Sequence, residues 1–347
     1  MIVVTGAAGF IGSAVIWRLN LTGEKNILAV DSLRSNEKWK NLLGLSFCNY
    51  LDKGDFIEKL ENGELENIDV IFHLGACSST TQSDENYLIE NNYRYTLRIA
   101  QWIAKHPRTR LIYASSAATY GNGENGYLDN EAEIEKLRPL NCYGYSKQLF
   151  DLKAKNEGWL KNIVGLKYFN VFGPNEYHKG DMKSVICKAF ENAYRNGRIR
   201  LFKSYNHQYR DGEQLRDFIY VKNAVDITLF FWNKNRNIGG LFNVGTGIAK
   251  TWNDVAKALF CACGRTNIIK EKNGNLNSDR IIDANTGLIE YTEMPETLKN
   301  RYQYYTCADI SKLRDAGYNH KEFSIENAID DYVKNYLIDT KYLGDEK

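Results

Sequence analysis

The sequence is poor in several features that mark particular classes of protein. Its seven cysteines are an odd number and form no CxxC pair, which argues against a disulfide framework and favours reduced thiols in a cytoplasmic protein. No run of about 18 apolar residues occurs, so no membrane-spanning helix is expected. A strand that begins at Ile2 leaves no room for a cleavable leader, and we expect a soluble, unprocessed chain.

Charge of one sign is also lacking, because 45 basic and 43 acidic residues give a formal net charge of +2. This balance excludes nucleic acid and an anionic membrane surface as bulk partners. No group of His, Cys and Asp has the spacing of a metal site, so no metal is expected. A small anionic ligand is the partner that the composition leaves open.

Short apolar runs alternate with helical patterns through the first half of the chain, as is typical of β-α-β units on a parallel sheet. We therefore predict an α/β fold, with a Rossmann-type doubly wound parallel sheet and a smaller C-terminal α/β substrate-binding lobe. The expected strands are 2–5, 26–31, 68–74, 110–115 and 163–169, and the expected helices are 11–19, 55–61, 87–104 and one that follows Tyr143.

The predicted dinucleotide-binding domain covers residues 1–172, and residues 217–247 are expected to return to it. Residues 173–347 form mainly the substrate-binding lobe. The polar stretches 203–214 and 271–285 are expected to be surface loops or insertions.

A glycine-rich turn follows the first expected strand. Gly6, Gly9 and Gly12 have the spacing GxxGxxG and open an amphipathic helix. Glycine lets the backbone turn tightly and approach a pyrophosphate, whose charge is stabilised by the N–H groups at the helix N-terminus. Alone the motif is moderate evidence for dinucleotide binding, because glycines between a strand and a helix also serve as plain turn residues.

Asp31 ends the second expected strand, where a carboxylate commonly accepts hydrogen bonds from the adenosine ribose. That position favours NAD. Arg34 and Lys38 follow closely and could pair with the 2′-phosphate of NADP, or be two solvated cations. The residues leave both cofactors open.

Tyr143 and Lys147 are four residues apart, on one side of the helix that begins there. A neighbouring ammonium is expected to lower the pKa of the Tyr143 phenol from about 10 toward neutrality, which makes this tyrosine a candidate acid and base. Ser116 stands at the carboxyl end of a strand and could donate to a substrate oxygen. The order of glycine turn, Ser and Tyr-x-x-x-Lys is hard to obtain by chance.

The chain resembles the extended short-chain dehydrogenase/reductases of the NAD-dependent epimerase/dehydratase family, and within it the ADP-heptose 6-epimerase branch. The glycine turn and the Tyr-x-x-x-Lys pair indicate only the superfamily. Motifs that point to the heptose branch are Cys77 to Thr81, His178-Lys179-Gly180 and Arg301-Tyr302-Gln303, and the resemblance also rests on Gly75-Ala76, Tyr113 to Gly121, Tyr168 to Pro174 and Arg216 to Val221.

This resemblance implies an isomerase that inverts C6 of the heptose in ADP-D-glycero-beta-D-manno-heptose with a tightly bound NADP, NAD being the alternative. Loss of hydride gives a planar ketone, and return of hydride to the other face inverts the carbon. Each face then needs its own proton donor. The resemblance implies Tyr143 on one side and Lys179 on the other, with Ser116 and Asn170 orienting the substrate.

The resemblance also implies a homo-oligomer, specifically a pentamer, and supply of heptose to the inner core of lipopolysaccharide. Arg216 has the clearest physical role, because a guanidinium can bind a diphosphate through two parallel hydrogen bonds; an ion pair with Asp217 is the alternative. Implied cofactor contacts, with the glycine turn, are Gly6, Gly9, Phe10, Ile11, Gly12, Asp31, Ser32, Lys38, Lys53, Gly75, Ala76, Cys77, Ser78, Asn92, Lys147, Val171 and Lys179. Implied substrate contacts are Ser116, Asn170, Asp181, Lys188, Phe202, Lys203, Ser204, Tyr205, Arg216 and Tyr302.

Three positions depart from the family pattern: Leu74 replaces a common acid, Asp181 a small hydroxyl residue and Lys188 a histidine. A modified sugar or a different nucleotide carrier is therefore an alternative substrate. A UDP-hexose 4-epimerase or a sugar dehydratase would share the fold, but a dehydratase usually has an acidic pair where Ala117-Ala118 stands. A non-catalytic dinucleotide-binding protein would typically lack the Tyr or the Lys, and both are present.

Overall fold

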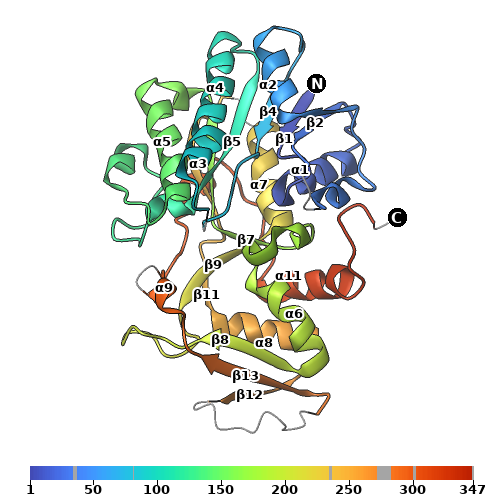
Figure 1. Cartoon of the computed structure of the whole chain (residues 1–347), viewed down its shortest axis with the longest axis vertical. Helices are drawn as coiled ribbons and strands as arrows, with labels where there is room; N and C mark the ends of the chain where they lie inside the picture. The colour runs from blue at the N-terminus through green and yellow to red at the C-terminus, as the bar shows by residue number, and fades with distance from the viewer. Residues whose placement is uncertain (34–36, 81, 234–236, 272–282, 300–301, 346–347) are drawn as a thin grey trace.

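The computed structural model of the chain describes residues 1–33, 37–80, 82–233, 237–271, 283–299 and 302–345. Arg34, Thr81 and Arg301, to which the sequence assigned roles, lie outside these residues, as does most of the stretch 271–285. In Figure 1 a large sheet flanked by helices forms the upper part of the molecule, and smaller sheets lie in its lower part.

The central strands of the large sheet are buried along their whole length. Apolar residues on both faces of a strand require cover on both sides, which is typical of parallel sheets. Among the described residues, seven strands pair in the order β10-β6-β5-β4-β1-β2-β3, and every neighbouring pair is parallel. They are β1 (Ile2–Thr5), β2 (Ile27–Asp31), β3 (Asn49–Asp52), β4 (Val70–His73), β5 (Arg110–Ser116), β6 (Val164–Tyr168) and β10 (Gly240–Val244).

Helices cover both faces of this sheet. Successive residues of a strand point to opposite faces, so neighbouring apolar residues belong to different hydrophobic cores. Val4 and Phe72 belong to a hydrophobic core shared with α1 (Phe10–Leu21) and α7 (Val221–Asn233). Their neighbours Val3 and Ile71 belong to a second core on the other face. The helices of that face are α2 (Lys53–Glu61), α4 (Tyr95–Lys105) and α5 (Cys142–Asn156).

The predicted doubly wound α/β fold is confirmed, and the expected elements of the first half are present. The expected helix 87–104 is a continuous helical run from α3 (Glu85–Leu88) through a π-helical turn (Ile89–Arg94) into α4. Such wide turns recur at functional sites, and this one carries Asn92. The stretch 203–214 is a loop, as predicted, between β8 and β9.

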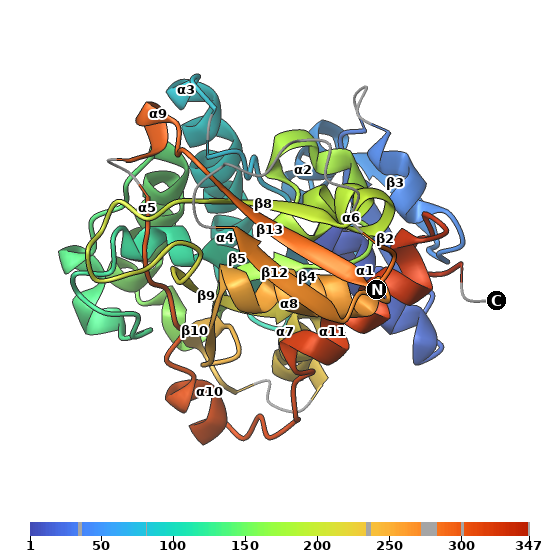
Figure 2. The same cartoon turned by 90° about the horizontal axis from the view of Figure 1, so that it is seen from below.

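The described residues form two further, smaller sheets. One has the order β11-β9-β7 and the other, parallel throughout, the order β12-β13-β8. Figure 2 shows β8, β13 and β12 side by side across the face seen from below. Their strands are β7 (Asn170–Phe172), β8 (Arg198–Phe202), β9 (Leu215–Tyr220), β11 (Ala249–Thr251), β12 (Asn267–Glu271) and β13 (Thr286–Thr292).

The helices around these small sheets share the core of α1 and α7. That core runs from Val4 of the large sheet to Ile199, Phe260 and Ile289 below it. No described helix is long and apolar enough to cross a lipid bilayer. The remaining helices are α6 (Val185–Asn196), α8 (Trp252–Ala262), α9 (Glu296–Lys299), α10 (Ser311–Asp315) and α11 (Ile325–Tyr332).

Candidate functional site

The strand order places a ligand-binding crevice between β1 and β4. The chain leaves these neighbours in opposite directions, and ligands of open α/β sheets bind outside such a switch point. The turns after the two strands touch: a Cβ atom on Gly6 would lie 2.7 Å from the Cα of Gly75. Gly6 has φ +69°, and a Cβ atom on Gly12 would overlap the Gly6 carbonyl. Only glycine fits this close approach.

The glycine turn leads directly into α1 at Phe10. Gly9 precedes the helix and has no side chain to cap it, and the first turn holds no acidic residue. The first N–H groups of α1 therefore face the crevice with their partial positive charge uncompensated. The residues of this turn fit the pyrophosphate of a dinucleotide.

Asp31 lies at the end of β2, and its carboxylate has several hydrogen-bond donors around it. Its carboxylate accepts hydrogen bonds from the Ala8 amide at 2.9 Å and the Ser32 amide at 2.6 Å, and from the Lys38 ammonium at 2.5 Å. Lys38 therefore does not project into solvent as a free cation. Asp31, Ser32, Lys38 and Lys53 together line a small cavity of about 190 Å³ beside Gly6 and Gly75.

Asn92 supports the loop after β4. Its amide oxygen accepts from the Cys77 amide at 2.8 Å, and its amide nitrogen donates to the Cys77 carbonyl at 3.0 Å and to the Ser146 hydroxyl at 3.0 Å. Asn92 is 1% exposed and does not line the crevice. It holds the predicted cofactor contacts Gly75 to Ser78 against α5 rather than facing the ligand.

Tyr143 and Lys147 lie on successive turns of α5 and face the carboxyl end of β5. Asn141 caps this helix by accepting a hydrogen bond from the Gly144 amide at 2.9 Å. The Lys147 ammonium donates to the Ala114 carbonyl at 2.8 Å, and burial lowers the pKa of Lys147 to about 8.

The expectation of a lowered Tyr143 pKa is wrong for this structure. Burial raises the pKa of the Tyr143 phenol above its usual value of 10, and a hydrogen bond with Ser116 opposes that rise only in part. Desolvation is the largest effect on the pKa of this phenol, and the Lys147 ammonium donates to the Ala114 carbonyl. Tyr143 is therefore a proton donor in its resting form.

Lys179 reaches the same cavity as Tyr143 from a different segment, the 3₁₀ turn Tyr177–Met182. Its ammonium lies 5.0 Å from the centre of the Phe10 ring, and burial lowers the pKa of Lys179 while the charge of Glu176 opposes this effect. Glu176, itself fully buried, anchors the segment by accepting hydrogen bonds from the Ser184 hydroxyl at 2.8 Å and the Gly173 amide at 3.2 Å.

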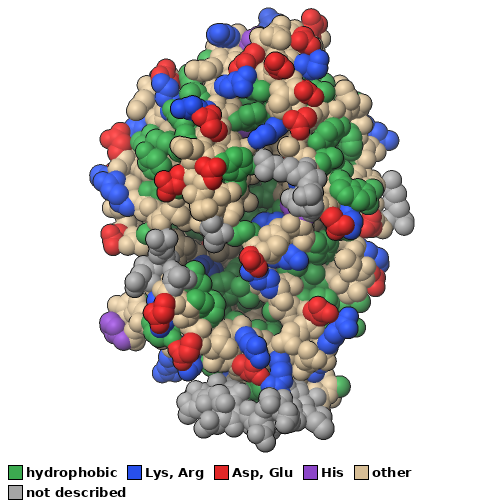
Figure 3. All heavy atoms as spheres, in the orientation of Figure 1, with side chains coloured by type: hydrophobic (Ala, Val, Ile, Leu, Met, Phe, Trp, Pro, Cys, Tyr) green, Lys and Arg blue, Asp and Glu red, His purple; other side chains and the backbone are tan. Residues whose placement is uncertain are grey.

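A single cavity of about 400 Å³ brings both candidate proton donors together with the glycine turn. The space-filling view shows the molecule hollowed where its upper and lower parts meet (Figure 3). The predicted residues that line this cavity are Gly6, Gly9, Phe10, Ile11, Gly12, Asp31, Lys38, Gly75, Ala76, Cys77, Ser78, Tyr143, Lys147 and Lys179.

A second cavity of about 410 Å³ lies between α6 and β8 and contains three of the predicted substrate residues, Lys188, Phe202 and Tyr302. Beside it, Arg216 is 6% exposed, with its guanidinium 5.9 Å from the Trp252 ring centre and 5.2 Å from that of Tyr302. Arg216 donates to the backbone carbonyls of its neighbours rather than pairing with Asp217.

Other predicted substrate residues line neither of these two cavities. Asp181 is exposed, and Lys203, Ser204 and Tyr205 lie on the loop after β8. Lys203 pairs with Glu293 at 2.7 Å. Val171 packs against the core from β7, where Asn170 is half-buried. The structure thus places these side chains around the crevice rather than in its lining.

Several residues at the site escaped the sequence analysis. Asn41 donates to the carbonyls of Ala8 at 2.9 Å and Asn175 at 3.0 Å and lies 3.1 Å from Nδ1 of His178, so it joins the glycine turn to the Lys179 segment. Trp252 stacks on Arg216 and its indole donates to the Tyr302 hydroxyl at 2.9 Å. His178 belongs to the motif His178-Lys179-Gly180, but no local sequence pattern indicated a role for Asn41 or Trp252.

Such a crevice belongs to enzymes that work through a bound dinucleotide, and the chain is a member of the NAD dependent epimerase/dehydratase family, whose model matches residues 2–245. Its cofactor is a nicotinamide dinucleotide. Within that family it belongs with the ADP-L-glycero-D-manno-heptose-6-epimerases, as the following relatives show, and it is an isomerase.

The chain is 46% identical over 338 residues to the protein of that name from Nitratidesulfovibrio vulgaris (strain DP4). It is 45% identical over 343 residues to the one from Fusobacterium nucleatum subsp. nucleatum, and both alignments cover 97% of this chain and 98% of the relative. The solved structure of the Helicobacter pylori ADP-L-glycero-D-manno-heptose-6-epimerase matches with a TM-score of 0.73 and 26% identity, over 96% of this chain and 95% of that one. A UDP-glucose 4-epimerase from Thermotoga maritima shares the fold, with a TM-score of 0.75 and 24% identity over 98% and 99% of the two chains.

Proposed function

We propose that the protein inverts C6 of the heptose in ADP-D-glycero-beta-D-manno-heptose to give the L-glycero epimer, with NADP as its bound cofactor. The observation that carries this proposal is the cavity that Tyr143 and Lys179 line together with the glycine turn. A single proton donor suffices to reduce one face of a ketone, whereas inversion needs a donor for each face.

The two donors differ in their chemistry. Tyr143 gives or takes a proton at its phenolic oxygen, which Ser116 contacts by a hydrogen bond. Lys179 gives or takes a proton at Nζ, and burial lowers the pKa of its ammonium, which favours release of that proton. A nicotinamide held by the glycine turn and Lys147 would supply acceptance and return of the hydride at C6, so the reaction would have no net redox change.

The second cavity supports the choice of an adenine nucleotide carrier. The rings of Phe202, Trp252 and Tyr302 line it and provide flat surfaces for a base. Lys188 stands at its edge, and Arg216 stacks on the rings of Trp252 and Tyr302. These cations suit the diphosphate, with Asp181 outside the lining.

NADP is favoured over NAD by the cations beside Asp31. Lys38 neutralises the carboxylate that would otherwise repel a 2′-phosphate, and Lys53 lines the same small cavity. Asp31 keeps its two backbone donors in either case and can still face the ribose hydroxyls, so NAD is the alternative cofactor.

The wider context also belongs to this proposal. We assign residues 1–172 with 217–247 to the dinucleotide-binding domain and 173–347 mainly to the substrate-binding lobe. From the family resemblance we also propose a cytoplasmic homo-oligomer, specifically a pentamer. Supply of heptose for lipopolysaccharide accords with the heptose epimerase names of the relatives. All seven cysteines are free.

The decisive experiment incubates purified protein, without added cofactor, with ADP-D-glycero-beta-D-manno-heptose and separates the two C6 epimers by chromatography. Wild type should convert the substrate, and Tyr143→Phe with Lys179→Met should lose at least about 100-fold in rate, since general acid–base catalysis is worth that much. The matched control is Tyr145→Phe with Lys155→Met, which alters the outward side of the same helix.

The control variant should retain wild-type rates. No conversion by wild type that carries its dinucleotide would refute the heptose assignment. Conversion of a UDP-hexose instead would identify the protein as a 4-epimerase with the same proton donors.

A further inference from the structure

A buried ion pair that the proposed mechanism does not use lies behind the catalytic helix. Asp151 of α5 is 0% exposed and Lys167 of β6 is 1% exposed, and Nζ lies 2.7 Å from Oδ2. Burying two charges costs desolvation energy that their attraction often only just repays, and an apolar pair can serve stability equally well. The position of this ion pair in the fold therefore says more about its role than its contribution to stability does.

Asp151 ties α5 to β5. It follows Lys147 by one helical turn, and its Oδ1 accepts a hydrogen bond from the Tyr113 hydroxyl at 2.8 Å. Its Oδ2 accepts a second from the Ser115 hydroxyl at 2.7 Å, in addition to the bond from Lys167. Two side chains of one strand thus converge on a single carboxylate of the catalytic helix.

Ser115 stands between the two residues of β5 that meet the catalytic side chains. Before it, the Ala114 carbonyl accepts from Lys147 at 2.8 Å. After it, Ser116 hydrogen-bonds Tyr143. Ser115 lines the cavity together with Ala114, and Asp151 holds its hydroxyl, so fixing Ser115 also fixes the adjacent backbone of the strand end.

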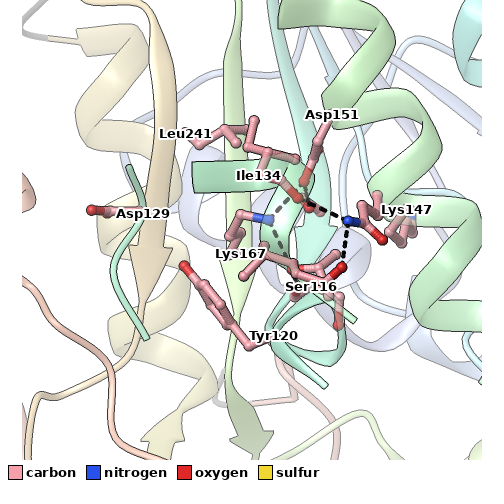
Figure 4. Close-up of polar contacts among 12 residues, drawn as sticks. Ser116, Tyr120, Asp129, Ile134, Lys147, Asp151, Lys167 and Leu241 are labelled. Carbon is pink, nitrogen blue, oxygen red and sulfur yellow. Dashed lines mark hydrogen bonds and ion pairs between the residues drawn. The ribbon is translucent and has the colours of Figure 1, made fainter. Parts of the chain in front are cut away.

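Lys167 secures the same strand end from β6. Its ammonium also donates to the Thr119 hydroxyl at 2.8 Å, which in turn donates to the Ser116 carbonyl at 2.8 Å. Figure 4 shows Lys167 and Asp151 pointing toward one another, with Ser116 and Lys147 beside them. The ion pair therefore holds the strand end at Ser116 through two routes, one through Ser115 and one through Thr119.

The charge of Asp151 also acts on Lys147. Burial lowers the pKa of Lys147 to about 8, and the negative charge of Asp151 is the largest effect that opposes this lowering. The other groups that face Lys147 are the thiol of Cys77, after β4, and His73 of β4, whose pKa of about 3 keeps it neutral. Loss of the Asp151 charge would therefore lower the Lys147 pKa further.

We propose that Asp151, neutralised by Lys167, is a positioning residue that fixes Ser116 and the charged Lys147 for proton transfer through Tyr143. This inference rests on the proposed epimerase activity and deepens it. Asp151 acts only through these neighbours and does not line either cavity.

The test uses the full-length protein with its dinucleotide and separates charge from shape. In Asp151→Asn the new amide oxygen can still accept from Ser115 and Lys167, and the amide nitrogen can donate to the Tyr113 hydroxyl. Because that variant leaves Lys167 buried without its counter-charge, Asp151→Asn with Lys167→Met is made as well. The control removes another ion pair, Asp331 and Lys222, which are 2.8 Å apart and line neither cavity, by Asp331→Asn with Lys222→Met.

Both Asp151 variants should lose about 10- to 100-fold in kcat while KM changes less than about twofold, because the second cavity is untouched. Lys147 should lose its proton at lower pH, so the alkaline limb of the kcat profile should move down by about one pH unit. In the Asp331 control, the alkaline limb of the kcat profile should stay at its wild-type pH. An alkaline limb that stays at its wild-type pH in both Asp151 variants would overturn the proposal, since a merely structural role lowers activity at every pH.

Ser115→Ala keeps both charges and should fold even if the Asp151 variants do not. Ser115→Ala should lower kcat about tenfold without changing the pH of the alkaline limb of the kcat profile. An unchanged kcat would overturn the positioning role of Asp151. The pH dependence of NADPH binding, followed by fluorescence in wild type and the double variant, provides a readout without substrate. If the pH profile of NADPH binding shifts in the double variant but wild type is inactive, only the epimerase proposal is refuted. If that profile does not shift, the positioning role of Asp151 is refuted.

Discussion

At the level of single residues, we infer that Asp31 and Lys38 determine which dinucleotide binds. The Asp31 carboxylate would repel a 2′-phosphate, and the Lys38 ammonium neutralises it at 2.5 Å. We predict that Lys38→Ala weakens NADPH binding about tenfold, equivalent to about 1.4 kcal/mol, and NADH binding less than about threefold. Fluorescence titration of the two reduced cofactors measures both constants.

Lys40→Ala provides the matched control, because Lys40 is a neighbouring lysine that pairs with Glu37 at 3.0 Å. It should leave both affinities at the wild-type level. Equal losses of NADPH and NADH affinity in Lys38→Ala would contradict the assignment of Lys38 to the 2′-phosphate.

His73 makes the stability of the fold depend on pH. It is 2% exposed, with Nδ1 2.7 Å from the Thr5 hydroxyl and Nε2 2.8 Å from the Thr96 hydroxyl, and burial lowers its pKa to about 3. Between pH 3 and about 6.5 the unfolded chain holds a proton on this ring that the folded chain does not, so stability is complete above about 6.5 and falls as the pH drops. The slope from this group is at most about 1.4 kcal/mol per pH unit.

His73→Asn should therefore flatten the pH dependence of the free energy of unfolding, measured in urea at pH 4.5, 5.5 and 7. The exposed His207 provides the control, and His207→Asn should keep the wild-type slope. A His73→Asn protein with the full wild-type slope would show that other groups cause the acid sensitivity.

At the level of elements, the turn from β1 into α1 depends on glycine for its shape. A Cβ atom on Gly12 would overlap the Gly6 carbonyl, which the contact of Gly6 with Gly75 keeps from moving aside. We predict that Gly12→Ala lowers the free energy of unfolding by more than about 2 kcal/mol and weakens dinucleotide binding more than tenfold. Chemical denaturation and fluorescence titration measure the two effects.

Gly264→Ala is the corresponding control at the end of α8. Gly264 has φ +80° and open space around its missing Cβ, so alanine there should cost only about 1 kcal/mol and leave dinucleotide binding unchanged. If Gly12→Ala bound the dinucleotide as wild type does, the close approach would not be essential to the cofactor site.

The sequence predicted those elements that a contiguous motif or a local hydrophobic periodicity indicates. The glycine turn, the helix after Tyr143 and the strands around them each have such a signal. They predicted the fold and the candidates Ser116, Tyr143 and Lys147, whereas the role of Lys179 came only from the family resemblance. The pairing of β8 with β13 joins residues about 90 positions apart, and the pair Asp151 and Lys167 joins a helix to a strand. No local periodicity marks contacts of that kind, so they emerge only when the chain is folded.

At the level of the whole molecule, one hydrophobic core joins the two parts. It runs from Val4 of β1 to Ile289 of β13, and both of these side chains are fully buried. The upper sheet buries one face against α2, α4 and α5, but the apolar side chains of its other face share their core with the lower sheets. We expect them to unfold together.

Ile289→Ala tests this expectation because it leaves a cavity in the core far from the dinucleotide. The substitution should lower the free energy of unfolding by about 2 to 5 kcal/mol. Hydrogen exchange followed segment by segment should show amides of β1 and of β13 losing protection by the same amount. The control Ile248→Ala removes a side chain that is 61% exposed and should change neither segment. If only the amides of β13 lost protection, the lower part would open on its own, and the substrate-binding residues on β8 would move independently of the catalytic side chains above them.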